Sequence, residues 1–241
     1  MKFFLCDYQE GAHPDIMEAL LQTNMEQTCG YGLDGYCEEA AELIKRECGR
    51  ENIFVHFLVG GTQTNATVIA AALRPYEGVL SPVTGHINTH ETGAIEACGH
   101  KVLPLDANDG KITAEQIEKA WYSHVNDETK EHNVKPGMVY ISFPTELGTL
   151  YKKAELEKIS KTCRECGLYL YVDGARMGYG LMSGENDLTL ADFAKYCDAF
   201  YIGGTKVGTL FGEALVITNE KLNENFRYMI KQKGGLLAKG R

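Results

Sequence analysis

The chain alternates short apolar segments with amphipathic ones, and this alternation limits the folds that it can adopt. Several of its segments are apolar and rich in β-branched or aromatic side chains, without regular alternation of polar and apolar positions. They are residues 53–59, 138–143, 168–172 and 199–202, with residues 78–80, 101–105 and 214–218 as further candidates. Segments of this kind are typical of strands that are covered by helices on both faces.

Amphipathic helices are expected between these strands. Residues 14–24 place Ile16 and Leu20 on one stripe, and Pro14 stands near the first helical position. The other segments with a helical pattern are residues 37–48, 62–73 and 152–166.

Two further helices are predicted from their caps. Thr113 and Gln116 fit a capping box that opens a helix through Trp121. Asn219 is expected to cap a final helix that runs towards Ile230. The polar residues 123–135 are interpreted as a surface loop.

Strands that alternate with helices predict an α/β fold, a three-layer sandwich with a mostly parallel central sheet. The length of 241 residues, with 44% apolar and 24% charged residues, is typical of a globular α/β protein. Such sheets bind ligands at the carboxyl ends of their strands. The functional residues are therefore expected at strand ends.

Charge and hydropathy exclude several classes of partner. The net charge of −9, without a basic cluster, argues against nucleic-acid binding. The N-terminus does not have the pattern of a signal peptide, and no apolar run approaches the roughly 20 residues that span a bilayer. We therefore expect a cytoplasmic protein that does not contact membranes.

Eight cysteines raise the question of disulfides or metal binding. A long chain without a secretory signal favours reduced thiols. Cys163 and Cys166 form a Cys-x-x-Cys pair, but they fall at the end of a predicted helix, where the dipole does not favour a thiolate. These cysteines are interpreted as structural, and no metal site is predicted.

Asp173 and Lys206 each follow a predicted strand, with a helical stretch between the two strands. This arrangement can hold pyridoxal phosphate, because the aspartate keeps the ring nitrogen protonated and the lysine bonds covalently to the cofactor. Each residue also has an ordinary interpretation: Asp173 as a helix cap, and Lys206 as a lysine that extends from a strand end to solvent. Gly203 and Gly204 favour the cofactor, because they leave room beside the amine.

Gly60, Gly61 and Thr62 follow a predicted strand and open a helix. Glycines allow close approach of the backbone, and free N–H groups at a helix start attract an anion such as phosphate. The alternative is a tight turn with a threonine cap. The spacing of these glycines fits neither a Walker loop nor a dinucleotide-binding motif.

Three other side chains are candidates for chemistry. His86 and His90 are four residues apart and could share a helical face, although the sequence lacks the zinc-protease spacing. His90 is interpreted as an ordinary histidine, whereas His86 could stack over a cofactor ring and move protons. Arg176 could bind a substrate carboxylate through its forked guanidinium, or form a surface ion pair.

Taken together, these motifs resemble the threonine aldolase and β-eliminating lyase family of fold-type I pyridoxal-phosphate enzymes. The resemblance covers nearly the whole chain. In chain order its motifs are Leu5-Cys6-Asp7, Gly30-Tyr31-Gly32-x-Asp34, Gly60-Gly61-Thr62-x-x-Asn65, Gly85-His86-Ile87, Val172-Asp173-Gly174-Ala175-Arg176 and Thr205-Lys206.

The resemblance implies a role for each matching residue. Lys206 would carry the cofactor, Asp173 would pair with its ring nitrogen and His86 would stack on the ring. The phosphate would lie against Gly61 and Thr62, with Thr205 also in the cofactor site. Arg176 would bind the substrate carboxylate, and Asp7 and Tyr31 would line the site, in part across a subunit boundary.

The resemblance also implies the activity and the assembly. It implies cleavage of the Cα–Cβ bond of β-hydroxy amino acids such as L-threonine and L-allo-threonine, in a homodimer or homotetramer. Residues 1–241 would form an aspartate aminotransferase-like large domain with an N-terminal arm, and the C-terminal small domain of relatives would be absent or truncated.

Two departures from the family pattern leave alternatives open. The family often has a histidine where this chain has Glu146, so the base for the substrate hydroxyl is His86, Glu146 or a water. The end at Arg241 also allows a truncated noncatalytic remnant. A β-eliminating or desulfurising lyase on the same scaffold is the other alternative.

Overall fold

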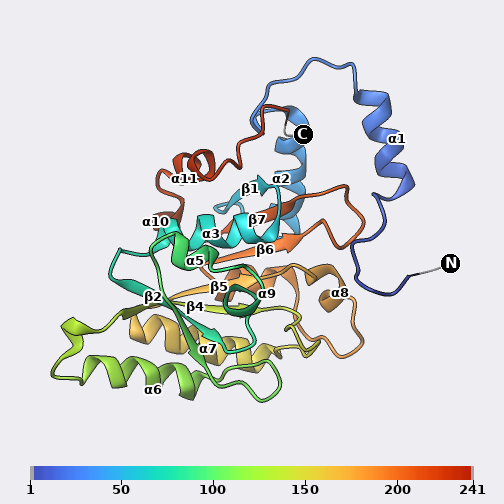
Figure 1. Cartoon of the computed structure of the whole chain (residues 1–241). Helices are drawn as coiled ribbons and strands as arrows, with labels where there is room; N and C mark the ends of the chain where they lie inside the picture. The colour runs from blue at the N-terminus through green and yellow to red at the C-terminus, as the bar shows by residue number, and fades with distance from the viewer. Residues whose placement is uncertain (1–2, 240–241) are drawn as a thin grey trace.

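A seven-stranded sheet forms the centre of the computed structural model, which describes residues 3–239 (Figure 1). The strands are β1 (Phe54–Leu58), β2 (Glu77–Pro82), β3 (Val102–Leu105), β4 (Lys135–Ser142), β5 (Tyr169–Asp173), β6 (Ala199–Gly203) and β7 (Glu213–Ile217). Their order in the sheet is β1-β7-β6-β5-β4-β2-β3. β7 runs antiparallel to β1 and β6, while the other neighbouring pairs are parallel. The predicted mostly parallel sheet is confirmed, including its weaker candidate strands.

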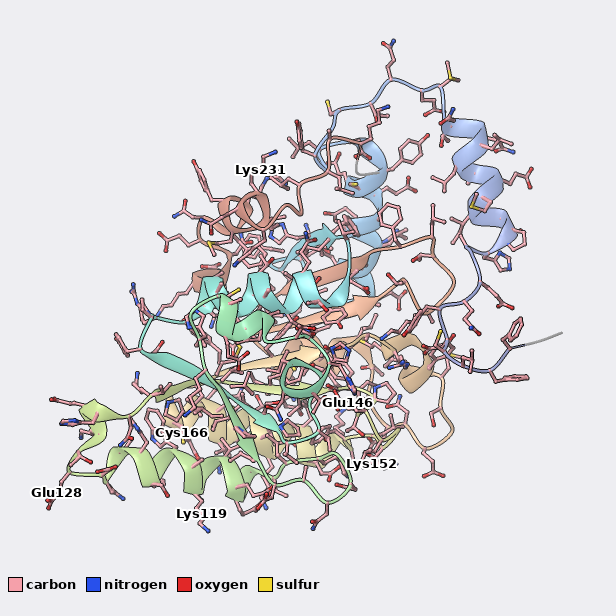
Figure 2. All side chains as sticks on the ribbon, viewed as in Figure 1. Lys119, Glu128, Glu146, Lys152, Cys166 and Lys231 are labelled. Carbon is pink, nitrogen blue, oxygen red and sulfur yellow. The ribbon has the colours of Figure 1, made fainter. Side chains whose placement is uncertain are left out.

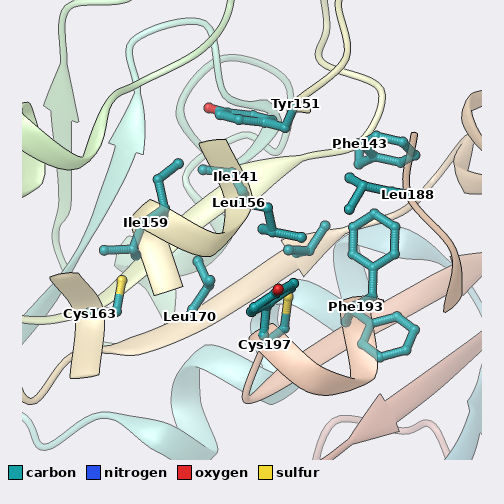
Figure 3. Close-up of a cluster of buried hydrophobic side chains, with 14 of the residues drawn as sticks. Ile141, Phe143, Tyr151, Leu156, Ile159, Cys163, Leu170, Leu188, Phe193 and Cys197 are labelled. Atoms are coloured by element: carbon teal, nitrogen blue, oxygen red, sulfur yellow. The ribbon is translucent and has the colours of Figure 1, made fainter. Parts of the chain in front are cut away.

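Helices cover both faces of the sheet, which gives the three expected layers. One face packs against α2 (Gly35–Cys48), α6 (Ala114–Val125), α7 (Lys153–Cys166) and α9 (Leu190–Tyr196). Figure 3 shows part of this core, where Leu156 and Ile159 of α7 meet Ile141 of β4 and Leu170 of β5.

The opposite face carries the helices nearest the predicted phosphate turn. They are α3 (Gly61–Ala72), α4 (His86–Thr89), α5 (Ala94–Ala97), α10 (Glu220–Asn223) and α11 (Phe226–Gln232). Val68 and Ile69 of α3 are buried here against strand residues such as Tyr171 and Tyr201. This face therefore contains both an apolar core and the polar tips of several tyrosines.

The N-terminal segment extends away from the sheet. In α1 (Pro14–Thr23) every side chain is at least partly exposed, and the helix lies to one side of the sheet in Figure 1. Large apolar side chains of this arm face solvent, among them Phe4, Leu5, Leu21 and Met25. Among the described residues, no helix is both long enough and apolar enough to cross a membrane.

Two local predictions are wrong. The single helix expected from Asn219 towards Ile230 is divided into α10 and α11, because Asn225 adopts a left-handed conformation with φ 58° between them. The expected loop at residues 123–135 is shorter, since α6 continues to Val125 and a 3-10 turn, η1 (Lys130–His132), follows it.

The two helix caps predicted from the sequence are confirmed. Thr113 and Gln116 form the predicted capping box, and Asn219 caps α10 through Lys221 N. Cys163 and Cys166 are buried at the end of α7, and burial raises the pKa of both thiols. That shift opposes thiolate formation and agrees with a structural role. Residues 3–239 contain no group of three or more His, Cys, Asp or Glu side chains placed to bind a metal ion.

Candidate active site

Asp173 ends β5 and accepts hydrogen bonds from several directions. The hydroxyls of Tyr201 and Tyr140 donate to its two carboxylate oxygens at 2.5 and 2.7 Å. The Asn65 amide donates to Oδ2 at 3.0 Å, and Ala175 N donates to Oδ1 at 3.0 Å. These partners come from β6, β4, α3 and the turn after β5, so the folded sheet itself orients the carboxylate.

The local reason for this cluster is strand alternation. Tyr171 and Asp173 are two positions apart in β5 and so face the same side of the sheet, towards α3. The pKa of each of the tyrosines Tyr140, Tyr171 and Tyr201 is raised well above its ordinary value, first by burial and then by the charge of Asp173. They therefore stay protonated, and Tyr140 and Tyr201 act as donors to the carboxylate.

Asn65 connects Asp173 to a second buried carboxylate. Its amide also donates to Glu91 Oε1 at 2.7 Å, while Tyr171 donates to Asn65 Oδ1 at 2.8 Å. Glu91 in turn contacts Nδ1 of His86 at 2.8 Å. The hydrogen bond that His86 makes to the Glu91 carboxylate raises the pKa of His86, outweighing the effect of burial. His86 thus belongs to the same network as Asp173, as its predicted role requires.

His86 lies at the mouth of the network rather than within it. Its side chain is 34% exposed, so one side of the ring can face a ligand. His90 follows the single turn α4 and is exposed, with its ring centroid 5.6 Å from that of His86. His86 is the first residue of α4, but His90 lies just beyond its end, so the two rings do not share a helical face. Residues 3–239 contain no group of three or more His, Cys, Asp or Glu side chains around them that could bind a metal ion.

Glu146 lies against the His86 turn. Its Oε1 accepts from His86 N at 2.9 Å and from the Ser142 hydroxyl at 2.6 Å. Its other oxygen is buried without a hydrogen-bond partner among the described residues. Burial raises the pKa of Glu146. Glu146 lies near the centre of the view in Figure 2, whereas Lys119 and Glu128 lie at the edge of the molecule.

Lys206 lies in the turn between β6 and β7. Its backbone oxygen accepts from the Tyr179 hydroxyl at 2.8 Å, and its Nζ lies 5.8 Å from the centroid of the Tyr8 ring. The preceding Thr205 donates to Glu213 at 3.1 Å. Sequence reasoning missed Glu213, although a lone acidic residue at the start of an apolar strand was a usable signal.

The predicted phosphate turn is the start of α3. Gly60 occupies the N-cap position without a side-chain cap within the described chain, so the first N–H groups of the helix are open to a ligand. A Cβ at Gly61 would approach the Tyr201 hydroxyl to 2.9 Å, so this turn packs directly against the Asp173 cluster. Thr62 is exposed at the same end.

Arg176 and Asp7 meet at the rim of the site. The guanidinium donates through Nε at 2.5 Å and through Nη2 at 3.0 Å to the two oxygens of Asp7. This bond lowers the pKa of the Asp7 carboxyl, and Lys206 also contributes to the lowering. The predicted carboxylate-binding fork is therefore filled by a carboxylate of the chain itself.

Tyr31 does not join these residues within one chain. Its backbone N donates to Leu237 O at 3.0 Å, and its ring lies under Lys231 Nζ at 5.0 Å. It has φ 62°, in the left-handed region, and its side chain is 44% exposed. A contribution of Tyr31 to the site of a partner subunit stays a prediction.

Comparison with known proteins decides the family. A family model described as beta-eliminating lyase matches residues 4–240. The chain belongs to this family. The low specificity L-threonine aldolase of Pseudomonas aeruginosa is 32% identical over 240 residues, which are 99% of this chain and 68% of that protein. A second low specificity L-threonine aldolase, from a Pseudomonas species, is 33% identical over 243 residues.

Solved structures resemble this chain closely in fold, and one of them is a threonine aldolase. The threonine aldolase of Leishmania major superposes with a TM-score of 0.93 at 52% identity, covering 97% of this chain and 67% of that one. An aspartate aminotransferase from Thermus thermophilus shares the fold with a TM-score of 0.72 at 16% identity. The expected aminotransferase-like fold is confirmed.

Membership in this lyase family indicates pyridoxal 5'-phosphate as the cofactor, and the residues present fit it. The open start of α3 suits a phosphate. The buried carboxyl group of Asp173 is an acidic partner for a protonated ring nitrogen, and Lys206 supplies an amine. These three features come from different elements at the carboxyl edge of the sheet.

Proposed function

We propose that the protein is a pyridoxal-phosphate-dependent aldehyde lyase that cleaves the Cα–Cβ bond of β-hydroxy amino acids. L-Threonine or L-allo-threonine would give glycine and acetaldehyde. One observation carries the proposal: Asp173 ends β5 and Lys206 follows β6, and these are adjacent parallel strands. The turn after β5 is joined to the end of β6 by a hydrogen bond from Gly203 N to Gly174 O at 2.9 Å.

The roles of the residues follow from their positions. Lys206 would hold the cofactor covalently, and Asp173 would keep the ring nitrogen protonated. The backbone at Gly61 and Thr62 would bind the phosphate, with Thr205 beside it, and His86 would cover one face of the ring. When bound, pyridoxal phosphate supplies an electron-withdrawing ring that stabilises negative charge at Cα.

Bond cleavage also needs an acceptor for the proton of the substrate hydroxyl. His86, Glu146 and a water are the three candidates. The raised pKa of Glu146 makes its carboxylate a stronger base than an exposed one, and its contact with His86 N supports a role for it near the predicted ring position. His86 is itself paired with Glu91, which can stabilise a proton taken up on the imidazole.

Substrate orientation would depend on Arg176. A forked guanidinium binds a carboxylate through two parallel hydrogen bonds, and the Asp7 pair shows that Arg176 can adopt this geometry. A substrate carboxylate would displace Asp7 from the fork. Asp7 would then be free to line the site, as the family resemblance implies.

Assembly and location complete the proposal. We propose that residues 1–241 act as the large cofactor-binding domain with an N-terminal arm, in a cytoplasmic homodimer or homotetramer. The exposed apolar side chains of the arm support an oligomer. Tyr31 would then line the site of a partner subunit.

Substrate turnover tests the function. Purified protein supplied with pyridoxal phosphate is incubated separately with L-threonine, L-allo-threonine and L-cysteine, and glycine, acetaldehyde and pyruvate are measured. The proposal predicts glycine and acetaldehyde in equal amounts from the β-hydroxy amino acids. Pyruvate without glycine would favour the β-eliminating alternative. A cofactor adduct on Lys206 without turnover of any substrate would favour a noncatalytic remnant.

A further inference from the structure

Glu213 is a buried carboxylate to which the proposed function gives no role. It is the first residue of β7, it is 6% exposed, and the rest of its strand is apolar. Burying a charged group is costly unless it is paired or hydrogen-bonded, so its partners indicate why an acid is present. Those partners belong to the turn that carries Lys206.

The carboxylate holds the two residues that precede Lys206. Gly204 N donates to Oε2 at 3.0 Å, and the Thr205 hydroxyl donates to Oε1 at 3.1 Å. The Thr205 hydroxyl also accepts from Gly212 N at 3.0 Å, which closes the turn. A Cβ at Gly204 would come within 2.7 Å of Gly212 O, so the backbone has little freedom to shift.

We propose that Glu213 is a positioning residue that orients Lys206 for covalent attachment of pyridoxal phosphate. The inference rests on the proposed function, because that function assigns the cofactor to Lys206. Glu213 would act through the turn. Because its carboxylate anchors Gly204 and Thr205, the backbone at Lys206 leaves the sheet in one direction. The amine of Lys206 is then directed towards the carboxyl edge of the sheet, where Asp173 lies.

The charges around Glu213 make its effect on Lys206 depend on pH. Burial raises the pKa of Glu213 to about 7, and the charge of Asp173 adds to this rise. The hydrogen bonds from Gly204 and Thr205 and the charge of Lys206 lower the pKa and so oppose the rise. Tyr171 of β5 also interacts with Glu213, and the pKa of Tyr171 is raised in part by the charge of Glu213. The ionised carboxylate places a negative charge near Lys206, whereas the neutral acid does not.

Three variants test the inference. Glu213→Ala removes both acceptor oxygens. Glu213→Gln keeps an acceptor for Gly204 N and a hydrogen-bonding group for Thr205, but it carries no charge. Glu224→Ala is a control at an exposed site. Two measurements are made on each protein. Hydrogen exchange of the peptide spanning residues 203–213 is followed without added cofactor. The rate of attachment of pyridoxal phosphate to Lys206 is followed from pH 6 to 8 by borohydride trapping and peptide mass mapping.

The expected results separate positioning from mere stability. Glu213→Ala exchanges faster at the turn and attaches cofactor roughly tenfold more slowly than Glu213→Gln at every pH, since it loses two buried hydrogen bonds. Glu213→Gln keeps wild-type exchange, and its attachment rate relative to wild type rises with pH because it lacks the titrating charge. Glu224→Ala matches wild type in both measurements.

Other outcomes overturn the inference in distinguishable ways. Attachment to wild-type Lys206 with unchanged rates in Glu213→Ala would overturn the role of Glu213 and leave the proposed function standing. Absence of any adduct on wild-type Lys206 would overturn the proposed function and this inference with it. If Glu213→Ala does not fold, Glu213→Gln decides alone, and a constant rate relative to wild type from pH 6 to 8 would contradict the account.

Discussion

The two halves of the site are held in different ways. The half around Asp173 is buried, with Asp173 4% exposed and both Asn65 and Tyr140 at 0%. The half around Arg176 lies at the rim, where the paired side chains of Arg176 and Asp7 are 43% and 31% exposed. One half is built from strands and α3, whereas the other depends on the N-terminal arm.

This difference in burial determines which contacts folding fixes and which contacts a substrate can replace. A buried donor or acceptor left without a partner costs about 1–3 kcal/mol, so the Asp173 network cannot rearrange cheaply. An exposed ion pair contributes only about 0–1 kcal/mol, so a substrate carboxylate can replace Asp7 at little cost. The buried half around Asp173 is therefore preorganised, and the pair at the rim is exchangeable.

Lys206 joins the two halves, and its replacement should have the largest effect. Lys206→Ala removes the amine that holds the cofactor, and we expect activity to fall by roughly a thousandfold or more. The unfolding midpoint should change little because the side chain is only partly buried. Lys221→Ala, at an exposed lysine, serves as the control, and equal activity of both variants would refute the assignment.

The second prediction tests the buried half. Asp173→Asn removes the charge and places an amide donor against groups that already donate to this position. We expect a loss of activity of roughly a hundredfold, because stabilisation of the ring charge is lost. We also expect a loss of about 3 kcal/mol in the free energy of unfolding, measured by urea denaturation. Unchanged stability would show that the network is not preorganised.

The third prediction uses pH to probe the same buried half. The pKa of Glu213 is about 7 in the folded chain against an ordinary value of 4.5, so the folded state binds its proton more tightly than the unfolded state. The contribution of Glu213 to the free energy of unfolding is fully present below pH 4.5. About 3 kcal/mol of it is lost as pH rises through about 7. Glu213→Gln should remove that loss, so its stability relative to wild type should rise between pH 5 and 8. A difference that does not vary with pH would contradict the account.

The fourth prediction concerns the exposed rim and has the smallest effect on the fold. Arg176→Lys keeps the charge but loses the fork, and we expect KM for L-threonine to rise about tenfold, equivalent to about 1.4 kcal/mol of binding. Stability should change by less than about 1 kcal/mol, because the Asp7 pair is exposed. A large loss of stability with unchanged KM would place Arg176 with the buried half instead.

The sequence allowed the sheet and the strand-end pair to be predicted for a physical reason. Buried strands must be apolar, and the carboxyl ends of parallel strands meet at one edge, so Asp173 and Lys206 could be brought together without coordinates. The tyrosines could not be assigned in this way. Tyr140 and Tyr201 have the pattern of ordinary strand aromatics, and only the strand order reveals that both face Asp173.

Other features depended on local backbone states that composition does not reveal. Asn225 ends one helix and starts another through a left-handed conformation that the apolar pattern around it does not indicate. Glu91 and Asn65 are far from each other in sequence, and their contact requires α3 to pack beside the turn after α4. The pairing of Arg176 with Asp7 likewise required the path of the N-terminal arm.

The most direct test is a crystal structure of the protein loaded with pyridoxal phosphate and reduced with borohydride. The account predicts a covalent bond from Lys206 Nζ to the cofactor, with the Asp173 carboxylate within about 3 Å of the ring nitrogen, the length of a charge-assisted hydrogen bond. A cofactor bonded to another lysine, or a ring nitrogen beyond the reach of Asp173, would contradict it.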